Sequence, residues 1–526
     1  MGRPTAHEPL IVVGSGIAGG LLALAAAESG PVVLVTKEAL GAGSTARAQG
    51  GIAAAVDTGD SVEAHLGDTL AAGAGLCDPD AAARICREGP DQIAALLRRG
   101  VAFDRRGGRL RLAREGAHSA ARVVHAGGDA TGAHIVVALT AALRADPRIQ
   151  VLEGERALEV VLRDGRVAGL RSAGADGRKR VRGARAVALA AGGMGQLHPR
   201  TTNPPGATAD GPALAARAGA ALADLELTQF HPTALALGDG PLALVSEAVR
   251  GEGAVLRDAR GRRFMPNEHP MAELGPRDVV ARAIARRAAE LGGDVTLDLR
   301  HLDPGAVRGR FPSVAALCAA HGLDLARDPI PVTPAAHYAI GGVLADMAGR
   351  STVPGLFAVG ECAATGAHGA NRLASNGLLE AAVLAAGAAD ALAGDLDDWP
   401  EGPAAAPAPP PPSGAGGAVT RAALQSAMWR GVGVERDADG IDAAIRELDA
   451  LPRGTDPETD NLLLTARLAA AAAGLRAESR GAHFRRDHPL PDPAQARRIA
   501  WVGGVPHHLR PVPLARPHRA VAKEAA

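Results

Sequence analysis

Two glycine-rich segments in this chain each follow a run of apolar residues. The first, GSGIAG at residues 14–19, comes after an apolar run at 10–13 and before a stretch rich in Ala and Leu. In such a turn Gly14 would allow the tight bend, Gly16 would let a phosphate approach the backbone, and Gly19 would permit close packing of helix on strand. The motif is weak alone, but its place between a strand and a helix, whose N-terminus attracts phosphate, predicts dinucleotide binding.

The second glycine-rich segment favours FAD over NAD. Residues 352–361 read TVPGLFAVGE, in which an apolar run ends in Gly360 and is followed by Glu361. This pattern resembles the second fingerprint of FAD-binding proteins, and it predicts that Glu361 accepts hydrogen bonds from the ribityl chain. One departure is that Thr36 and Lys37 stand at the end of the second strand, where a dinucleotide fold normally has an acid for the ribose hydroxyls.

The other polar residues that could do chemistry are ordinary when each is taken alone. Arg277 stands beside an aspartate, as in many surface ion pairs, and His231 precedes a proline, as loop residues often do. Glu115 could be a solvated turn charge, Asp210 a helix cap, and Lys37 an exposed charge at a strand end. Residue type and spacing alone therefore do not indicate that these residues form a catalytic or binding site.

Hydrophobic periodicity places these residues on an α/β framework. Strands are expected at residues 10–13, 31–36, 186–191 and 356–359. Because these strands are so far apart in the sequence, we expect a Rossmann-like FAD-binding domain interrupted by an inserted α+β capping domain. The expected limits are 1–224 and 341–400 for the FAD-binding domain and 225–340 for the capping domain.

The last part of the chain begins with a segment of almost only Pro, Ala, Gly and Ser. It reads PAAAPAPPPPSGAGG and predicts a linker at 401–418. Beyond the linker, helical periodicity at 421–428, 441–451 and 461–478 predicts a C-terminal helical domain with a tail, at 419–526.

Composition argues against several classes of function. The 526 residues carry 57 acidic and 57 basic side chains and few aromatics, so no nucleic-acid partner is expected. The four cysteines show no CxxC spacing, so we expect no metal site, no disulfide framework and a reducing compartment. The apolar segment at 10–27 lacks a basic n-region and is broken by glycines, so we expect a cytoplasmic protein without a membrane partner.

Longer motifs occur along the chain in a fixed order. They are GSTARAQGGIA at 43–53, QFHPT at 229–233, RGEG at 250–253, PRD at 276–278, HYAIGG at 337–342 and HGANRLAS at 368–375. The ordered set resembles the superfamily of flavoproteins that includes succinate dehydrogenases, fumarate reductases and L-aspartate oxidases. The resemblance covers about residues 8–395, and MWR at 428–430 with ESRGAH at 478–483 extends it into the tail.

Several details favour the L-aspartate oxidase branch of this superfamily. Ser44 stands where the membrane dehydrogenases have a histidine bonded to the flavin, so the resemblance implies FAD that is held non-covalently. The loop REGAHS at 114–119 resembles the oxidase loop whose glutamate, here Glu115, faces the substrate amino group. The chain departs from the family pattern at Ala117 and Gly377, which replace a frequent glycine and a frequent serine.

The resemblance implies roles for two groups of residues. Those expected to bind FAD are Gly14, Ser15, Gly16, Ile17, Ala18, Gly19, Lys37, Ser44, Thr45, Ala46, Arg47, Ala48, Gln49, Gly50, Gly51, Asp210, Glu361, Gly377 and Leu378. Arg277 and Arg372 would bind the two substrate carboxylates. The clamp would be completed by His231 and His337, with Ser246 and Gln229 as hydrogen-bond donors. Glu115 would orient the ammonium group, and Arg277 would also serve in proton transfer.

The activity that the resemblance implies is the oxidation of L-aspartate to iminoaspartate. Oxygen would reoxidise the flavin and give hydrogen peroxide, or fumarate would do so and give succinate. This is the first step of NAD biosynthesis through quinolinate, and because iminoaspartate hydrolyses readily, quinolinate synthase is the implied functional partner. Two alternatives stay open: a soluble fumarate reductase or succinate dehydrogenase flavoprotein subunit, and a flavin-binding module without catalysis.

Overall fold

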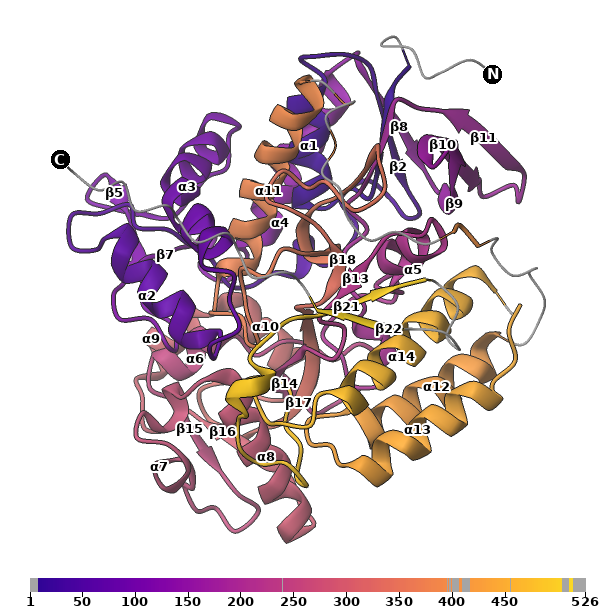
Figure 1. Ribbon diagram of the computed structural model, residues 1–526. Coiled ribbons are helices and arrows are strands. Elements are labelled where there is room, and N and C mark those ends of the chain that lie inside the picture. Colours follow the sequence, from indigo (N-terminus) through magenta and orange to yellow (C-terminus); the bar gives the residue numbers. More distant parts are fainter. Residues whose placement is uncertain are drawn as a thin grey trace, which may run out of the picture.

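A parallel sheet lies at the centre of the protein. The computed structural model describes residues 8–238, 240–394, 396, 399, 406–408, 417–454, 456–503 and 510–513. The strand order is β19 (Leu356–Ala358), β12 (Ala186–Leu189), β1 (Leu10–Val13), β2 (Val32–Thr36) and β8 (Ile149–Glu153). Every residue of β1 is buried, as expected for a parallel strand that is covered on both faces. Beside the sheet pack the helices α1 (Ile17–Ala26), α4 (Thr131–Ala145) and α11 (Asn376–Ala393) (Figure 1).

The strands expected from the sequence are confirmed, with small differences at their ends. β2 begins at Val32, one residue later than expected, and β19 ends at Ala358, one residue earlier. β12 ends at Leu189 although the apolar run continues to Ala191. The reason is that Ala190 and Ala191 leave the sheet and line a cleft at its edge.

Smaller elements complete this first domain. They are the antiparallel sheet of β9 (Arg156–Arg163), β10 (Arg166–Ala173) and β11 (Lys179–Gly183), the short strands β3 (Ile52–Ala53), β4 (Arg105–Arg106), β5 (Arg109–Leu110), β6 (Leu112–Ala113) and β7 (Val123–Val124), and the helices α2 (Val62–Ala72), α3 (Pro79–Arg98) and α5 (Asp210–Arg217). Asp78 begins α3 by accepting the backbone N–H groups of Asp80 and Ala81, with Pro79 at the first helical position.

The segment between β13 (Leu222–Ala223) and β18 (Gly342–Leu344) forms the inserted α+β unit that the sequence predicts. Its sheet has the order β14 (Thr228–Leu235), β17 (Ile330–Ala339), β16 (Val295–Asp298) and β15 (Val255–Arg257). Its helices are α6 (Glu247–Gly251), α7 (Met265–Glu268), α8 (Arg277–Leu291), α9 (Pro304–Arg310) and α10 (Pro312–Ala320). Buried residues from Leu235 to Val332 form a hydrophobic core of their own, separate from the core around the parallel sheet.

The expected C-terminal helices are also present. They are α12 (Gly417–Val432), α13 (Ala438–Ala450) and α14 (Pro457–Leu475), which pack together at one side of the molecule (Figure 1). Trp429 of α12 joins this domain to the inserted unit, because its ring lies 6.0 Å from that of Phe230 in β14. Most of the expected linker, 401–418, lies outside the described residues.

The end of the chain contains a strand that the sequence does not predict. Beyond the helices, β21 (Ile499–Val502) pairs antiparallel with β13, with Leu222 opposite Trp501 and Ala223 opposite Ala500. The sheet is completed by β18, by β20 (Ala363–Ala364) and by β22 (Arg510–Pro513). The sequence analysis did not foresee this strand in the tail, because a four-residue strand has no periodicity of its own and is stabilised by a distant partner strand.

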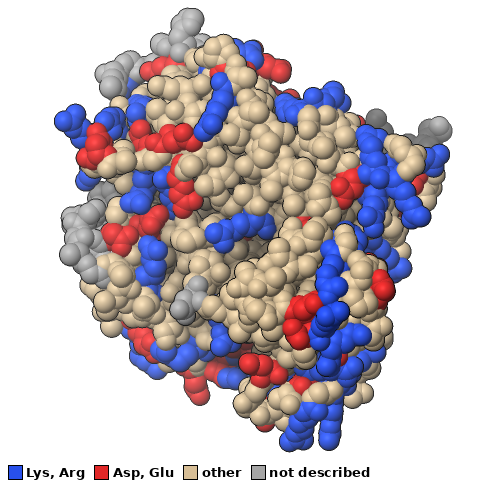
Figure 2. Space-filling model, turned by 180° about the vertical axis from the view of Figure 1, so that it is seen from behind, with Lys and Arg blue, Asp and Glu red and all other residues tan. Residues whose placement is uncertain are grey.

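One helix among the described residues, α11, is long and apolar enough to cross a membrane. Its most apolar window is 61% buried inside the protein, and it packs against α1 and α3. It is therefore the kind of apolar helix found in the core of a folded domain. On the surface, acidic and basic side chains are interspersed over the face shown in Figure 2, which agrees with a formal net charge of zero.

The added strand gives a test of the fold. Trp501 is 4% exposed and packs at the pairing with β13, so Trp501→Ala should destabilise the protein by about 3 kcal/mol through loss of buried contacts. Thermal denaturation followed by circular dichroism should show a lower midpoint. Val419→Ala is the matched control, since Val419 is 79% exposed and its change should have almost no effect. Equal midpoints for the two variants would contradict a stabilising role for β21.

Candidate active site

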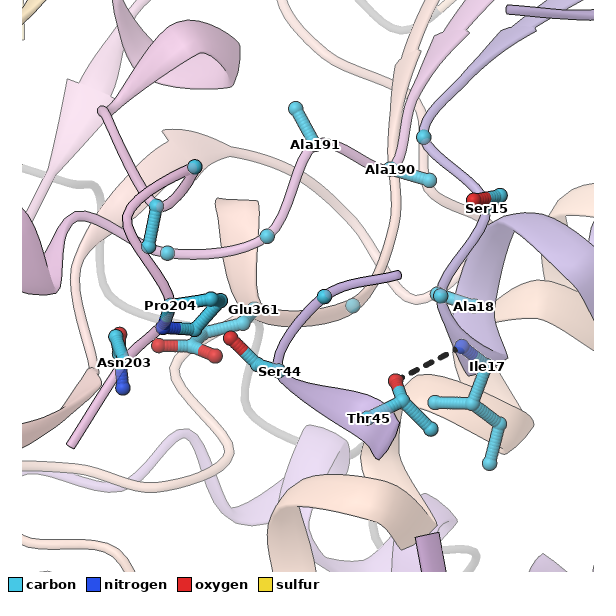
Figure 3. A pocket seen from close by; sticks show the side chains of 18 of the residues that line it. Ser15, Ile17, Ala18, Ser44, Thr45, Ala190, Ala191, Asn203, Pro204 and Glu361 are labelled. Atoms are coloured by element: carbon cyan, nitrogen blue, oxygen red, sulfur yellow. Dashed lines mark hydrogen bonds between the residues drawn. The ribbon is translucent and has the colours of Figure 1, made fainter. Parts of the chain in front are cut away.

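A cleft of about 1510 Å³, part of it open to solvent, lies along the carboxyl ends of the parallel strands. Its walls include Val13 at the end of β1, Thr36 at the end of β2, Ala190 after β12 and Val359 after β19. Ligands of open α/β sheets bind at this edge. In Figure 3 the loop from β1 to α1 with Ser15, and the start of α1 with Ile17 and Ala18, lie beside the segment that carries Ser44 and Thr45. This cleft is therefore the candidate cofactor site.

The first glycine-rich turn has the geometry that its sequence predicts. Gly14 has φ +110°, and a Cβ there would lie 2.2 Å from the carbonyl oxygen of Ala190. A Cβ on Gly19 would lie 2.0 Å from the carbonyl oxygen of Gly14, so Gly19 is needed for packing of the helix on the turn. The backbone N–H of Ile17 donates to Thr45 Oγ1 at 3.1 Å (Figure 3). The turn thus brings the N-terminus of α1 to the cleft, where a phosphate would be stabilised.

Most of the residues expected to bind FAD line this cleft. They are Gly14, Ser15, Gly16, Ile17, Ala18, Lys37, Ser44, Thr45, Arg47, Ala48, Asp210, Glu361, Gly377 and Leu378. The expected residues that do not line it are Gly19, Ala46, Gln49, Gly50 and Gly51. At Gly51 a side chain is excluded by packing, since a Cβ would lie 2.3 Å from the carbonyl oxygen of Val124.

A loop that the sequence analysis missed forms another part of the cleft wall. It contributes Thr202, Asn203, Pro204, Gly206 and Ala207. The only local signal was the turn-forming NPPG sequence, which is too common to indicate a ligand site. Asn203 and Pro204 lie close to Glu361 in Figure 3.

Glu361 lies in the cleft as the second glycine-rich segment predicts. Its Oε1 accepts a hydrogen bond from the backbone N–H of Ala339 at 3.0 Å, and burial raises its pKa to about 7. Gly193 is required beside it, because a Cβ there would lie 2.1 Å from Glu361 Oε1. A buried carboxyl of this kind suits hydroxyl donors, and so the donor set fits a dinucleotide with a polyol chain.

Two arginines meet at the end of the cleft. Arg277, the first residue of α8, donates from Nη1 to Gln229 Oε1 at 3.1 Å, and Arg372 donates from Nη2 to the same oxygen at 3.2 Å. Both arginines are buried, with exposed fractions of 8% and 6%. Burial, followed by the charge of Arg277, lowers the pKa of Arg372 to about 10. The Nε of Arg372 has no hydrogen-bond partner among the described residues. Two cations held this close form a site for an anion.

Gln229 holds these arginines rather than offering a donor to a substrate. Its Nε2 donates to Asn371 Oδ1 and to the backbone carbonyl of Arg372, both at 2.8 Å. The amide oxygen is thereby turned toward the two guanidinium groups. The expectation that Gln229 donates a hydrogen bond to substrate is therefore not met, because both of its amide protons are used within the protein.

His231 and His337 lie together beside the arginines. Their ring centroids are 5.1 Å apart, and His337 also lines the cleft, as Arg372 does. Burial, with a further contribution from Arg277, places the pKa of each histidine well below its usual value. Both rings are therefore neutral at neutral pH. In His231, Nδ1 accepts the backbone N–H of Thr233 at 3.2 Å, which assigns the ring proton to Nε2.

Glu115 Oε1 lies 3.8 Å from His125 Nε2 but accepts no hydrogen bond from the described residues, and burial lowers the pKa of His125 to about 4, so that ring is neutral at neutral pH. Glu115 Oε2 accepts from Ser375 Oγ at 2.7 Å. The loop is strained, since Ala117 has φ +63° where a glycine would be unstrained. Burial and the charge of Glu247 raise the pKa of Glu115. A buried carboxylate oxygen that accepts no hydrogen bond is a natural acceptor for an ammonium group.

Glu247 is a functional residue that the sequence analysis missed. Its Oε2 accepts from Arg277 Nε at 2.6 Å, and its Oε1 lies 3.6 Å from Arg250 Nη2. Burial alone would raise the pKa of Glu247, but the charges of Arg277 and Arg250 lower it to about 2. Gly116 allows this approach, because a Cβ there would lie 2.0 Å from Glu247 Oε1. No local pattern distinguishes this glutamate from others in the chain.

Ser246 and Gly377 complete the picture of the expected site residues. The Ser246 hydroxyl accepts the backbone N–H of Ala248 at 3.3 Å and caps α6, which leaves its proton available as a donor. At Gly377 a Cβ would lie 3.0 Å from the Tyr338 ring and 3.1 Å from Arg372 Nη1. The glycine therefore leaves room for Arg372, whose guanidinium lies 4.3 Å from the centre of the Tyr338 ring.

Comparison with known proteins agrees with this geometry. Residues 10–378 match the family described as FAD binding domain, and residues 455–508 match the family described as fumarate reductase flavoprotein C-term. The chain is 47% identical to the L-aspartate oxidase of Streptomyces coelicolor over 93% of this chain and 90% of that protein. It is 48% identical to the L-aspartate oxidase of Agrobacterium fabrum over 93% of this chain and 92% of that protein.

Solved structures with the same fold include a fumarate reductase and an Sdh1 protein. A mutant of the quinol fumarate reductase FrdA of E. coli has a TM-score of 0.87 at 30% identity, with 96% of each chain covered. Sdh1 of Mycobacterium smegmatis has a TM-score of 0.81 at 32% identity, with 96% of this chain and 94% of that chain covered. The predicted FAD-binding fold, with its inserted and C-terminal domains, is thus confirmed. The chain belongs to the L-aspartate oxidase family of FAD-binding flavoproteins.

Proposed function

We propose that this protein oxidises L-aspartate to iminoaspartate with non-covalently bound FAD. The observation that carries the proposal is the pair of buried arginines, Arg277 and Arg372, which share one amide oxygen of Gln229 at the end of the cofactor cleft. Glu115 Oε1, which accepts no hydrogen bond from the described residues, is the second element, since it suits an amine. The names of the relatives support this choice of substrate.

The arginines would bind the two carboxylates of the substrate. A guanidinium group matches a carboxylate with two parallel hydrogen bonds, and a dianion would relieve the repulsion between Arg277 and Arg372. The neutral His231 would donate from Nε2 to a carboxylate oxygen, and Ser246 would donate its hydroxyl proton. His337 is held by Thr202, with 2.8 Å between His337 Nδ1 and Thr202 Oγ1, and would contact the substrate from the other side of the site.

Glu115 would orient the amino group and so select L-aspartate over succinate. Its Oε2 is fixed by Ser375, which leaves Oε1 for one amine proton. Glu247 keeps its negative charge and holds Arg277 from the side away from Gln229. We propose that proton transfer at this end of the site involves the Arg277–Glu247 pair, in which the proton on Nε already points at a carboxylate oxygen.

FAD, when bound, would accept a hydride from the substrate Cα. The residues of this chain bind it without a covalent bond, because Ser44 lines the cleft where a histidine would be needed for attachment. The N-terminus of α11, at Asn376, lies next to the cleft residues Gly377 and Leu378 and would stabilise negative charge on the flavin ring.

The reduced cofactor would be reoxidised by oxygen, giving hydrogen peroxide, or by fumarate, giving succinate. Iminoaspartate hydrolyses readily, and so a quinolinate synthase that consumes it in NAD biosynthesis is the proposed functional partner. We propose a cytoplasmic location, in agreement with four unpaired cysteines, at Cys77, Cys86, Cys318 and Cys362.

A soluble fumarate reductase is the second candidate, favoured by the likeness to fumarate reductase structures. The first test is the absorbance of the bound flavin under anaerobic conditions. L-aspartate should bleach it, whereas D-aspartate and succinate should not at equal concentration, because only L-aspartate places its amine at Glu115 while both arginines hold carboxylates. Bleaching by succinate alone would move the protein to the dehydrogenase branch, and no bleaching at all would favour a flavin-binding module without catalysis.

The role of Glu115 gives a second test. Glu115→Gln keeps the shape but removes a charge-assisted hydrogen bond of about 2 kcal/mol, so kcat/KM for L-aspartate should fall about 30-fold. Reduction of fumarate by the reduced enzyme should be almost unchanged, since fumarate has no amine. An equal loss in both reactions would show that Glu115 acts on the site as a whole.

The raised pKa of Glu115 leads to a prediction for the pH dependence of kcat/KM. The pKa of Glu115 is raised, and binding of the ammonium group requires its anion, so kcat/KM for L-aspartate should fall as the pH drops through this raised pKa. His231 and His337 have lowered pKa values and remain neutral over this range, so they should add no step near their usual pKa. In Glu115→Gln the acid limb should disappear. Its persistence in that variant would assign it to another group.

The arginine clamp gives a further test. Arg372→Lys keeps a charge but loses the bidentate fork and the stacking on Tyr338, so kcat/KM should fall about 100-fold, equivalent to about 3 kcal/mol. The control is Arg180→Lys, an equivalent change in an ion pair with Asp176 in which the arginine side chain is 40% exposed. The measurement is the steady-state kinetics of the Arg372→Lys and Arg180→Lys variants with saturating FAD. Similar kinetics for both variants would contradict a clamp role for Arg372.

A further inference from the structure

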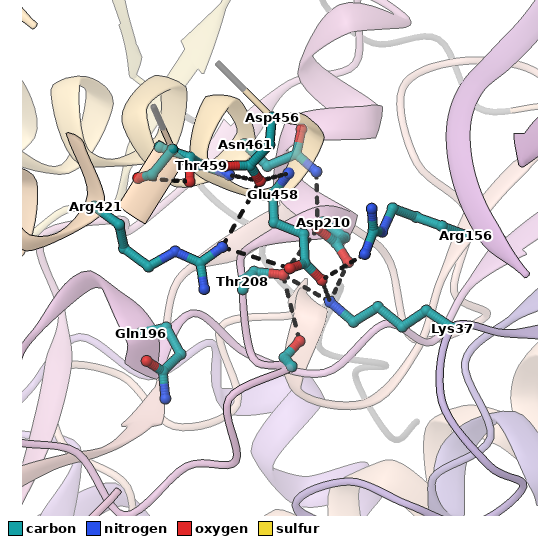
Figure 4. A network of polar contacts seen from close by, with 12 residues as sticks. Lys37, Arg156, Gln196, Thr208, Asp210, Arg421, Asp456, Glu458, Thr459 and Asn461 are labelled. Atoms are coloured by element: carbon teal, nitrogen blue, oxygen red, sulfur yellow. Dashed lines mark hydrogen bonds and ion pairs between the residues drawn. The ribbon is translucent and has the colours of Figure 1, made fainter. Parts of the chain in front are cut away.

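The C-terminal domain reaches the cofactor cleft through one helix, α14. Lys37, directly after β2, donates hydrogen bonds from Nζ to Thr208 Oγ1, to Asp210 Oδ2 and to Glu458 Oε1, each at 2.7 Å. Thr208 and Asp210 belong to the first domain, whereas Glu458 lies in the first turn of α14, more than 400 residues away from Lys37 in sequence. Figure 4 shows Lys37 between Asp210 and Glu458 at the start of this helix.

A second residue of the same helix holds the other side of this cluster. Asn461 Nδ2 donates to Asp210 Oδ1 at 2.8 Å, and its Oδ1 accepts from Arg217. Glu458 and Asn461 are three residues apart and therefore lie on one face of α14. The start of the helix is fixed, because Asp456 accepts the backbone N–H groups of Glu458 and Thr459 at 3.1 Å.

This cluster differs from an ordinary surface ion pair. The side chains of Lys37, Asp210 and Glu458 are only 18%, 10% and 17% exposed. Burial alone would lower the pKa of Lys37, but the charges of Asp210 and Glu458 raise it above its usual value. Partly buried charges that are hydrogen-bonded on several sides depend strongly on each partner.

The cluster has an inner part and an outer part. Lys37, Asp210 and Arg156 line the cleft, whereas Glu458 and Asn461 do not line it and reach it through contacts with these three residues. Glu458 and Asn461 therefore fix the positions of the charged side chains of Lys37 and Asp210. Without Glu458, the flexible side chain of Lys37 would keep only its partners Thr208 and Asp210 on the first domain. Arg156 would also lose its ion pair with Glu458, in which Nη2 and Oε1 lie 3.6 Å apart.

We propose that Glu458 and Asn461 are positioning residues for FAD, through which the C-terminal helical domain sets the affinity of the cofactor. The inference rests on FAD binding in the cleft and not on the identity of the substrate. By linkage, bound FAD should in turn stabilise the docking of α14 on the first domain. The C-terminal domain is then a part of the cofactor site and not only a cover for the hydrophobic core.

The test is the release of FAD from the purified holoenzyme. Glu458→Gln and Asn461→Ala should each raise the dissociation constant of FAD about tenfold, equivalent to about 1.4 kcal/mol, measured as the rise in flavin fluorescence on dilution. Glu447→Gln is the matched control, because Glu447 also forms an ion pair in the C-terminal domain, with Arg430, but is far more exposed, at 48% for its side chain.

The sign of the effect separates positioning from simple electrostatics. Loss of a negative charge near an anionic cofactor should tighten binding if only charge mattered, whereas loss of positioning should weaken it. Asn461→Ala changes no charge and gives an independent reading if Glu458→Gln folds poorly. Tighter binding in Glu458→Gln, or affinities equal to the Glu447→Gln control in both variants, would overturn the proposal. Because the readout needs no substrate, failure here is distinct from failure of the proposed aspartate oxidation.

Discussion

The shared amide oxygen of Gln229 is the contact on which the rest of the site depends. One acceptor serves both buried guanidinium groups, at 3.1 and 3.2 Å, and the carboxylate of Glu247 balances the charge of Arg277. Arg277 comes from α8 of the inserted unit, whereas Arg372 comes from the loop that precedes α11 beside the parallel sheet. The two arginines therefore meet only while the inserted unit is docked on the first domain, so the proposed substrate clamp would depend on the position of the domains.

The two carboxylates near this clamp are made unequal by their surroundings. Glu247 contacts two arginines and keeps its charge, whereas Glu115 is held by a neutral serine and has a raised pKa. Environments that push apart the pKa values of neighbouring acids commonly assign them different tasks. Here the strongly charged acid, Glu247, fixes Arg277, and the less strongly held acid, Glu115, is the one proposed to bind the substrate amine.

The C-terminal residues stabilise the point where the chain leaves the first domain for the inserted unit. Arg498 pairs with Asp224 at 2.6 Å, and Arg476 pairs with Glu226 at 2.8 Å. β21 adds a strand next to β13 at the same place. Together with the contacts of Glu458 and Asn461 beside the cofactor cleft, these contacts join the last domain to the rest of the protein at two separate places.

The sequence by itself determined the local parts of this protein. The GSGIAG turn, the buried strands, the three C-terminal helices and the ordered motifs were all readable, because short-range sterics, hydrogen bonding and periodicity act between near neighbours. Only the tertiary structure decided which partner each polar group has. It made Gln229 a holder of arginines, paired Glu247 with Arg277, and brought Glu458 to Lys37. Such contacts join residues that are distant in sequence, and they form only when separately encoded surfaces pack together, so no local pattern contains them.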